Sequence, residues 1–165
     1  MTDSLDLGLK DKVAIVAGGG AAGNGIGNGR AAAILLAEAG VKVLIADRDQ
    51  NLADNTVKMI TKRGGVALSI DGDLTKSNDC IKVVDFAMSK WGRLDILDNN
   101  IGISSSLTVV AETEEHWDKV MDINLKPMFL MSKYSIPAMI ASGDGGSIVN
   151  ISSIWSVVTR PGRLS

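Results

Sequence analysis

Short apolar runs alternate with longer amphipathic segments along this chain, and that alternation limits its possible folds more than any other feature. The runs are continuous and rich in Val, Ile and Leu, which is typical of strands covered on both faces. We expect strands at Val13–Ala17, Val41–Ala46, Val66–Ile70, Ile96–Leu97 and Ile148–Ile151. We expect helices at Arg30–Ala39, Asn51–Arg63, Ser77–Lys90 and Glu114–Ala141. This order predicts an α/β fold with a parallel, doubly wound sheet and helices on both faces, built as one domain over residues 1–165.

Residues at the expected helix ends support this division. Gly40, Gly64 and Gly92 follow three of the helices, where a left-handed residue is often needed. Thr75 and Thr113 precede two of them and are candidate N-caps.

The composition excludes several classes of function. The chain has 165 residues, 45% of them hydrophobic and 22% charged, which is typical of a globular domain with its own core. A net charge of −2 without a long basic run argues against a nucleic-acid partner. No apolar stretch is long enough to span a membrane, and residues 1–12 lack the pattern of a secretory signal. One His and one Cys argue against a metal site, and the unpaired Cys80 favours a cytoplasmic location.

A glycine-rich segment joins the first expected strand to the first expected helix. Glycine suits a tight turn and a close approach of the backbone to a pyrophosphate, whose charge the helix N-terminus favours. Gly18-x-Gly20-x-x-Gly23 matches the general dinucleotide fingerprint. Residues 24–29 are too rich in glycine to begin a stable helix, so we expect the helix to start near Gly29. A glycine loop without a ligand is the alternative, and the order strand, loop, helix, strand argues against it.

An acidic residue ends the second expected strand, about 20 residues beyond the loop. Asp47 can accept hydrogen bonds from the ribose hydroxyls of adenosine, and its charge would repel a 2′-phosphate. This favours NAD over NADP. Arg48 is the counter-argument, because a guanidinium can bind a phosphate. Asp47 can also be read as a turn or capping residue.

Two further motifs follow the fourth and fifth expected strands. Asn99-Asn100-Ile101-Gly102 follows the fourth expected strand, and Asn150-Ile151-Ser152-Ser153 ends the fifth. With the loop and Asp47, these segments make the chain resemble the short-chain dehydrogenase/reductase family from about Lys10 to Ser153. The resemblance implies a Rossmann-like fold and hydride transfer between a nicotinamide cofactor and an alcohol or carbonyl substrate. It also implies a homo-oligomer.

The resemblance implies roles for individual residues as well. Asp73 and Leu74 would contact the adenine, and Asn100 would border the cofactor. Ser153 matches the family's catalytic serine, which hydrogen-bonds the substrate oxygen and is not a nucleophile. Asn124 matches the helix asparagine that anchors a water in the proton relay. Its amide could instead bridge backbone groups, and both readings stay open.

The chain departs from the family pattern at several positions. Ala17 stands where the family has threonine, Ile101 where it has alanine, and Trp155 where a small residue is usual. The glycine loop also carries extra residues. Counting back from Gly40 makes Gly27-Asn28-Gly29 its final glycine pair. Gly25-Ile26-Gly27 would fit the residue types better and the helix length worse.

The family's Tyr-x-x-x-Lys motif has no match in this sequence. The one tyrosine, Tyr134, has Ala138 four residues later, and the chain stops at Ser165, about where the catalytic tyrosine is due. Two hypotheses follow: an oxidoreductase whose C-terminal portion is not represented, or a truncated or repurposed nucleotide-binding module. Ile148–Ile151 would be left on an unprotected sheet edge if no further strand followed.

Overall fold

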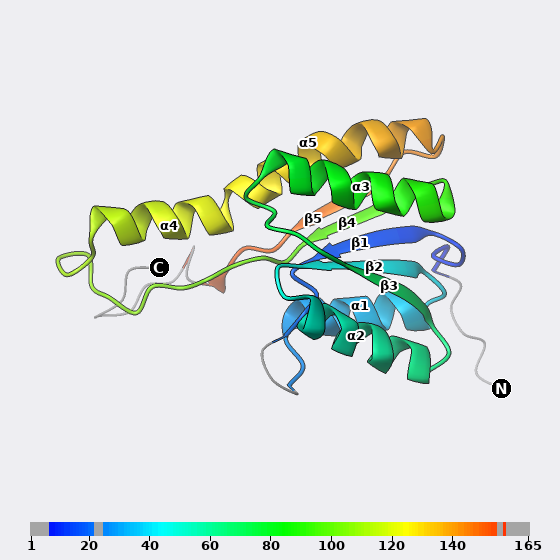
Figure 1. Cartoon of the computed structure of the whole chain (residues 1–165), viewed down its shortest axis with the longest axis horizontal. Helices are drawn as coiled ribbons and strands as arrows, with labels where there is room; N and C mark the ends of the chain where they lie inside the picture. The colour runs from blue at the N-terminus through cyan, green and yellow to red at the C-terminus, as the bar shows by residue number, and fades with distance from the viewer. Residues whose placement is uncertain (1–6, 22–24, 155–156, 158–165) are drawn as a thin grey trace.

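The computed structural model describes residues 7–21, 25–154 and 157, and Figure 1 shows the arrangement of their helices and strands. The strands are β1 (Val13–Ala17), β2 (Lys42–Asp47), β3 (Val66–Asp71), β4 (Ile96–Asn99) and β5 (Ser147–Asn150). The helices are α1 (Asn28–Glu38), α2 (Gln50–Lys62), α3 (Ser77–Trp91), α4 (Glu114–Asn124) and α5 (Lys126–Ala141). All strand pairs are parallel, and the sheet order is β3-β2-β1-β4-β5. The doubly wound parallel fold is therefore confirmed.

Helices cover both faces of the sheet and divide the core into two layers. Helices α1 and α2 lie on one face, and α3 and α5 lie on the other (Figure 1). Strand β1 is fully buried, with Ile15 facing α3 and α5 and Val16 facing α1 and α2. A continuous apolar run is the sequence signature of such a strand, because alternate side chains enter opposite layers.

One expected helix is two helices in the structure. The segment expected as Glu114–Ala141 is interrupted at Leu125, and the chain resumes as α5 at Lys126. Pro127 explains the break, because it has no N–H to donate to Ile123 and its ring conflicts with that carbonyl. Helix α4 buries none of its residues and extends beyond the sheet (Figure 1).

The structure decides the expected helix ends. Gly40, Gly64 and Gly92 have φ angles of 87°, 82° and 71°, so the left-handed conformation is confirmed at all three. Thr113 is confirmed as an N-cap, since its hydroxyl accepts a hydrogen bond from the His116 amide at 3.2 Å. Thr75 is wrong.

Lys76 is the N-cap of α3. Thr75 lies one residue earlier, and its hydroxyl donates to the Asp73 carboxylate at 2.7 Å. The hydroxyl therefore closes the turn that follows β3.

Strand β5 lies at the sheet edge formed by the described residues, where only β4 pairs with it. Its Val149 side chain is 45% exposed.

No described helix is both long and apolar enough to cross a membrane.

Candidate functional site

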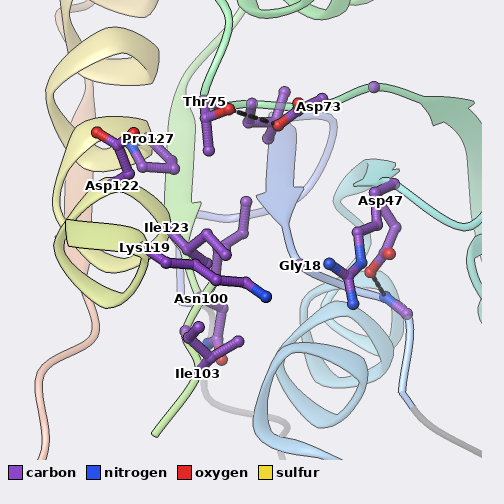
Figure 2. Close-up of a pocket in the computed structure, with 16 residues that line it drawn as sticks. Gly18, Asp47, Asp73, Thr75, Asn100, Ile103, Lys119, Asp122, Ile123 and Pro127 are labelled. Carbon is purple, nitrogen blue, oxygen red and sulfur yellow. Dashed lines mark hydrogen bonds between the residues drawn. The ribbon is translucent and has the colours of Figure 1, made fainter. Parts of the chain in front are cut away.

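A cavity of about 680 Å³ opens at the carboxyl ends of the strands. The chain runs outward from β1 to β2 and β3, then returns to β4 on the other side of β1. Ligands of open α/β sheets bind at such a switch point. The walls follow β1 (Gly18, Gly20), β2 (Asp47, Arg48), β3 (Gly72, Asp73, Leu74, Thr75) and β4 (Asn100, Ile101, Gly102, Ile103), and Lys119, Asp122, Ile123 and Pro127 complete them from α4 and α5 (Figure 2).

The glycine loop begins with a close backbone approach. The Gly18 amide donates to the Ala46 carbonyl at 2.7 Å, and Gly18 has a φ of 83°. A Cβ on Gly18 would lie 3.0 Å from the Asn100 carbonyl oxygen. Glycine is required here because both the conformation and the contact disfavour a side chain.

The far end of the loop fixes where α1 begins. A Cβ on Gly29 would overlap the Gly18 carbonyl oxygen, so Gly29 lets the helix lie directly against the start of the loop. Gly27 is the N-cap, and α1 begins at Asn28, close to the expected start at Gly29. Gly27, Asn28 and Gly29 do not line the cavity. Their contacts with a phosphate stay a prediction.

Asp47 connects the loop to the turn after β2. One carboxylate oxygen accepts from the Gly20 amide at 3.0 Å, and the other accepts from the Asp49 amide at 3.1 Å. A Cβ on Gly20 would lie 2.6 Å from the first oxygen. The turn role considered from the sequence is therefore real. These two hydrogen bonds leave lone pairs on the carboxylate that can accept further hydrogen bonds.

The turn after β3 forms the next wall. The Thr75 hydroxyl, which donates to Asp73, holds the pKa of the Asp73 carboxyl below its usual value. Lys76 lies 3.2 Å from the same carboxylate, and the Asp73 amide donates to Asp79 at 2.8 Å. Leu74 lines the cavity and is almost fully buried in the core. This turn is held firmly on both sides of Asp73.

Two asparagines after β4 have different tasks. Asn99 donates its side-chain amide to Asn150 at 2.8 Å and so ties β4 to β5. The Asn100 amide donates to Ala17 at 2.9 Å, which holds Asn100 beside the loop and in the cavity wall. The Asn100 side chain reaches Asp98 at 3.2 Å. Burial raises the pKa of the Asp98 carboxyl.

Comparisons with known proteins agree with this geometry. The family model described as short chain dehydrogenase matches residues 12–165. The chain belongs to the short-chain dehydrogenase family. The resemblance expected from the sequence is thus confirmed.

Individual members of the family cover nearly all of the chain. An uncharacterized oxidoreductase of Thermotoga maritima is 40% identical over 95% of this chain and 59% of its own length. The cyclohexanol dehydrogenase of an Acinetobacter strain is 36% identical over 91% and 58%. The crystal structure of a protein assigned to this family from Burkholderia xenovorans superposes with a TM-score of 0.89 at 39% identity, over 94% and 61%. The chain spans about three fifths of the length of these relatives.

Asn124, which the sequence matched to the family's helix asparagine, is the last residue of α4 and does not line the cavity. Its side-chain oxygen accepts from the Ile103 amide at 2.8 Å, and its side-chain nitrogen donates to the Ile103 carbonyl at 2.9 Å. Asn124 therefore bridges backbone groups, as one of the two sequence readings expected. The bridge fixes one wall of the cavity, because Ile103 lines it. The relay role stays a prediction.

The family's serine lies apart from the cavity. Ser153 comes three residues after β5, on an exposed segment at the same carboxyl edge of the sheet, and it does not line the cavity. Its catalytic role stays a prediction. Trp155, expected near the pocket floor, lies outside the described residues.

The sequence reasoning missed three features of the site. Lys119 reaches from α4 toward Asn100 and Gly18 (Figure 2). Arg30 and Thr56 are buried beneath the glycine loop. A charged residue within a run of small apolar residues was the one available signal for Arg30. Nothing in the sequence pointed to Thr56 or Lys119, because their helices had no assigned contact with the loop.

A polar cluster closes the loop between β4 and α4. The Ser105 hydroxyl donates to Glu112 at 2.6 Å, and a ring nitrogen of His116 lies 2.7 Å from the other Glu112 oxygen. The carboxylate stands between the serine and the histidine, so the imidazole is not placed to take the serine proton. The arrangement is therefore a loop closure and not a nucleophilic triad. Among the described residues no group of three or more potential metal ligands occurs.

Proposed function

We propose that the protein containing this chain is a NAD-dependent oxidoreductase that transfers hydride between the nicotinamide and an alcohol or carbonyl substrate. The contact between Asp47 and Gly20 carries this proposal. It joins a carboxylate at the end of β2 to the glycine loop after β1 at one cavity, and this arrangement resembles that of dinucleotide sites. The family membership supports the reaction class.

The start of α1, at the end of the glycine loop, is suited to a phosphate. The N-cap of α1 is Gly27, which offers no side-chain acceptor, and the first turn of α1 has no acidic residue. Its amide groups can therefore donate to a phosphate, and the helix dipole favours the negative charge. By contrast, α2 is capped by Asp49, whose side chain accepts from the amides of Asn51 and Leu52.

The bound nicotinamide would supply the hydride acceptor or donor, and the residues of this chain would bind and orient it. Asp47 would accept from the adenosine ribose, with Gly18, Gly20 and residues 27–29 at the pyrophosphate. Asp73 and Leu74 would contact the adenine, and Asn100 would border the cofactor. Ser153 would hydrogen-bond the substrate oxygen, and Asn124 would hold the wall beside it.

NAD is proposed over NADP because the Asp47 carboxylate would repel a 2′-phosphate. Titration of the protein with NADH and with NADPH, followed by the fluorescence of the dihydronicotinamide, tests this choice. We expect tighter binding of NADH. Tighter binding of NADPH would refute the choice.

A second candidate is a nucleotide-binding module without redox activity. The one tyrosine of the sequence, Tyr134, has Ala138 four residues later, where the family motif has lysine. Assays of NADH formation with a panel of alcohols separate the two, beginning with cyclohexanol because one relative is named for it. NADH binding without turnover of any alcohol or ketone would favour the module.

We also propose a homo-oligomer in the cytoplasm and a single domain over residues 1–165. Exposed apolar side chains along α5, including Phe129 and Ile140, support association. The free, buried Cys80 fits a reducing compartment. Sedimentation, cell fractionation and limited proteolysis test these three points in turn.

A further inference from the structure

The largest fully buried side chain of the described residues is a charged one. Arg30 lies in the first turn of α1, beneath the glycine loop. Its guanidinium donates to the Gly25 carbonyl at 2.5 Å, to the Ala21 carbonyl at 3.1 Å and to the Thr56 hydroxyl at 2.9 Å. Two of these three acceptors are backbone groups of the loop itself.

Thr56 extends this contact from a second helix. It is fully buried on α2, and its hydroxyl donates to the Gly19 carbonyl at 2.8 Å while it accepts from Arg30. The Leu52 carbonyl is more distant, at 3.4 Å, so the single hydroxyl proton serves Gly19. Arg30 and Thr56 together hold the loop carbonyls of Gly19, Ala21 and Gly25.

These hydrogen bonds fix the direction of the loop peptides. In a trans peptide the N–H points opposite to the C=O, so a carbonyl held toward α1 and α2 turns the next amide away from them. The Gly20 amide follows this rule and donates to Asp47. Oriented loop amides are what anion-binding loops present to a phosphate.

The loop has reason to need such an anchor. Residues 18–27 join β1 to α1, and six of these ten residues are glycine, the residue that loses most conformational freedom when it is ordered. A loop that is ordered before the ligand arrives spares the binding step that entropy. The guanidinium also brings positive charge near the loop.

We propose that Arg30 and Thr56 are positioning residues that set the glycine loop for a diphosphate and thereby determine affinity for diphosphate-containing nucleotides. The inference rests on the proposed nucleotide function of the cavity. It predicts that a substitution of Arg30 or Thr56 weakens the binding of the diphosphate and not the binding of the adenosine part of the same ligand.

Isothermal titration with ADP-ribose and with adenosine tests the proposal. Thr56→Val keeps the shape of the side chain and removes the hydroxyl, and Thr56→Ser restores the hydroxyl. We expect Thr56→Val to weaken ADP-ribose binding about tenfold, as for one hydrogen bond to a charged group, and adenosine binding less than about twofold. Thr56→Ser should bind ADP-ribose within about twofold of the unchanged protein.

A control variant and a second substitution complete the design. Thr61→Val removes a hydroxyl from the same helix, where Thr61 donates only to α2 carbonyls and is exposed, and it should leave both affinities unchanged. Arg30→Lys keeps the charge and loses the planar fork, so it should weaken ADP-ribose binding more than adenosine binding. Circular dichroism confirms that each variant is folded.

The possible failures are distinguishable. Unchanged ADP-ribose binding by Thr56→Val, or an equal loss for ADP-ribose and adenosine, overturns the positioning role and leaves the nucleotide function standing. An unchanged protein that binds neither ADP-ribose nor NADH overturns both.

Discussion

The substitution Asp47→Asn tests the charge on which the choice of cofactor depends. Asp47 ends β2 in the cavity wall and accepts hydrogen bonds from the amides of Gly20 and Asp49. Asparagine keeps one acceptor oxygen and removes the negative charge. The loop can therefore remain anchored while the electrostatic barrier to a 2′-phosphate disappears.

The magnitude follows from Coulomb's law. Two unit charges about 4 Å apart interact by roughly 4 kcal/mol near a protein surface and about 1 kcal/mol in bulk water. Asp47 is half-buried and the cavity is open to salt, so about 1–3 kcal/mol of repulsion should be relieved. This corresponds to NADPH binding roughly 5- to 150-fold tighter. NADH binding should weaken about tenfold, because a neutral acceptor replaces a charged one.

The assay is a pair of fluorescence titrations, with NADH and with NADPH, on the unchanged protein and on Asp47→Asn. Asp71→Asn is the matched control, because Asp71 ends the adjacent strand in register with Asp47 and does not line the cavity. The reasoning fails if Asp47→Asn leaves the ratio of the two affinities unchanged. It also fails if Asp71→Asn changes that ratio equally.

Three further predictions concern other groups. Lys119→Gln should weaken ADP-ribose binding up to about fivefold at low salt and less at high salt, as for an exposed ion pair, whereas Lys133→Gln on α5 should have no effect; titrations at two salt concentrations measure this. Because burial raises the pKa of Asp98, its stabilising contribution is present below the carboxyl's unfolded pKa and is lost as the pH rises through the folded one. Asp98→Asn should therefore raise the free energy of unfolding on the order of 1 kcal/mol at neutral pH and not in acid; urea unfolding at the two pH values would contradict this if the gain were equal. Burial raises the pKa of the Cys80 thiol to about 11, so a thiol reagent should modify the unfolded chain at neutral pH and spare the native one, and rapid labelling of the native protein would count against the structure.

The periodicity of the sequence predicted the strands and most helices to within two residues, because buried parallel strands and amphipathic helices leave distinct apolar patterns. The error at Glu114–Ala141 came from following that pattern across Pro127. The signal for the break was in the sequence, since a proline ends or bends a helix at the preceding turn. Thr75 was misplaced by a single residue, which is the usual uncertainty of a helix end.

The candidate site divided along a different line. Gly18, Asp47, Asp73 and Asn100 were predictable because each lies at or just beyond the end of a strand, and the carboxyl ends of parallel strands meet at one edge. Arg30 and Thr56 were not, because their roles depend on which helices lie under the loop. Such contacts join distant segments, and no local pattern encodes them.

The two walls of the cavity are built with unequal firmness. The glycine loop rests on the buried strand β1 and on Arg30, and Asp47 closes it from the side. The opposite wall comes largely from α4, which buries no residue among those described and packs mainly on α5. Segments with few buried contacts open at low free energy. The firm wall carries the residues proposed to bind adenosine and diphosphate, and the weakly supported wall carries Lys119. Asn124 ends the same helix and does not line the cavity. In the proposed function, the strand ends determine nucleotide binding, whereas the placement of Asn124 depends on its bridge to Ile103. Because the two groups of residues stand on different supports, we expect nucleotide binding and substrate turnover to respond to different substitutions.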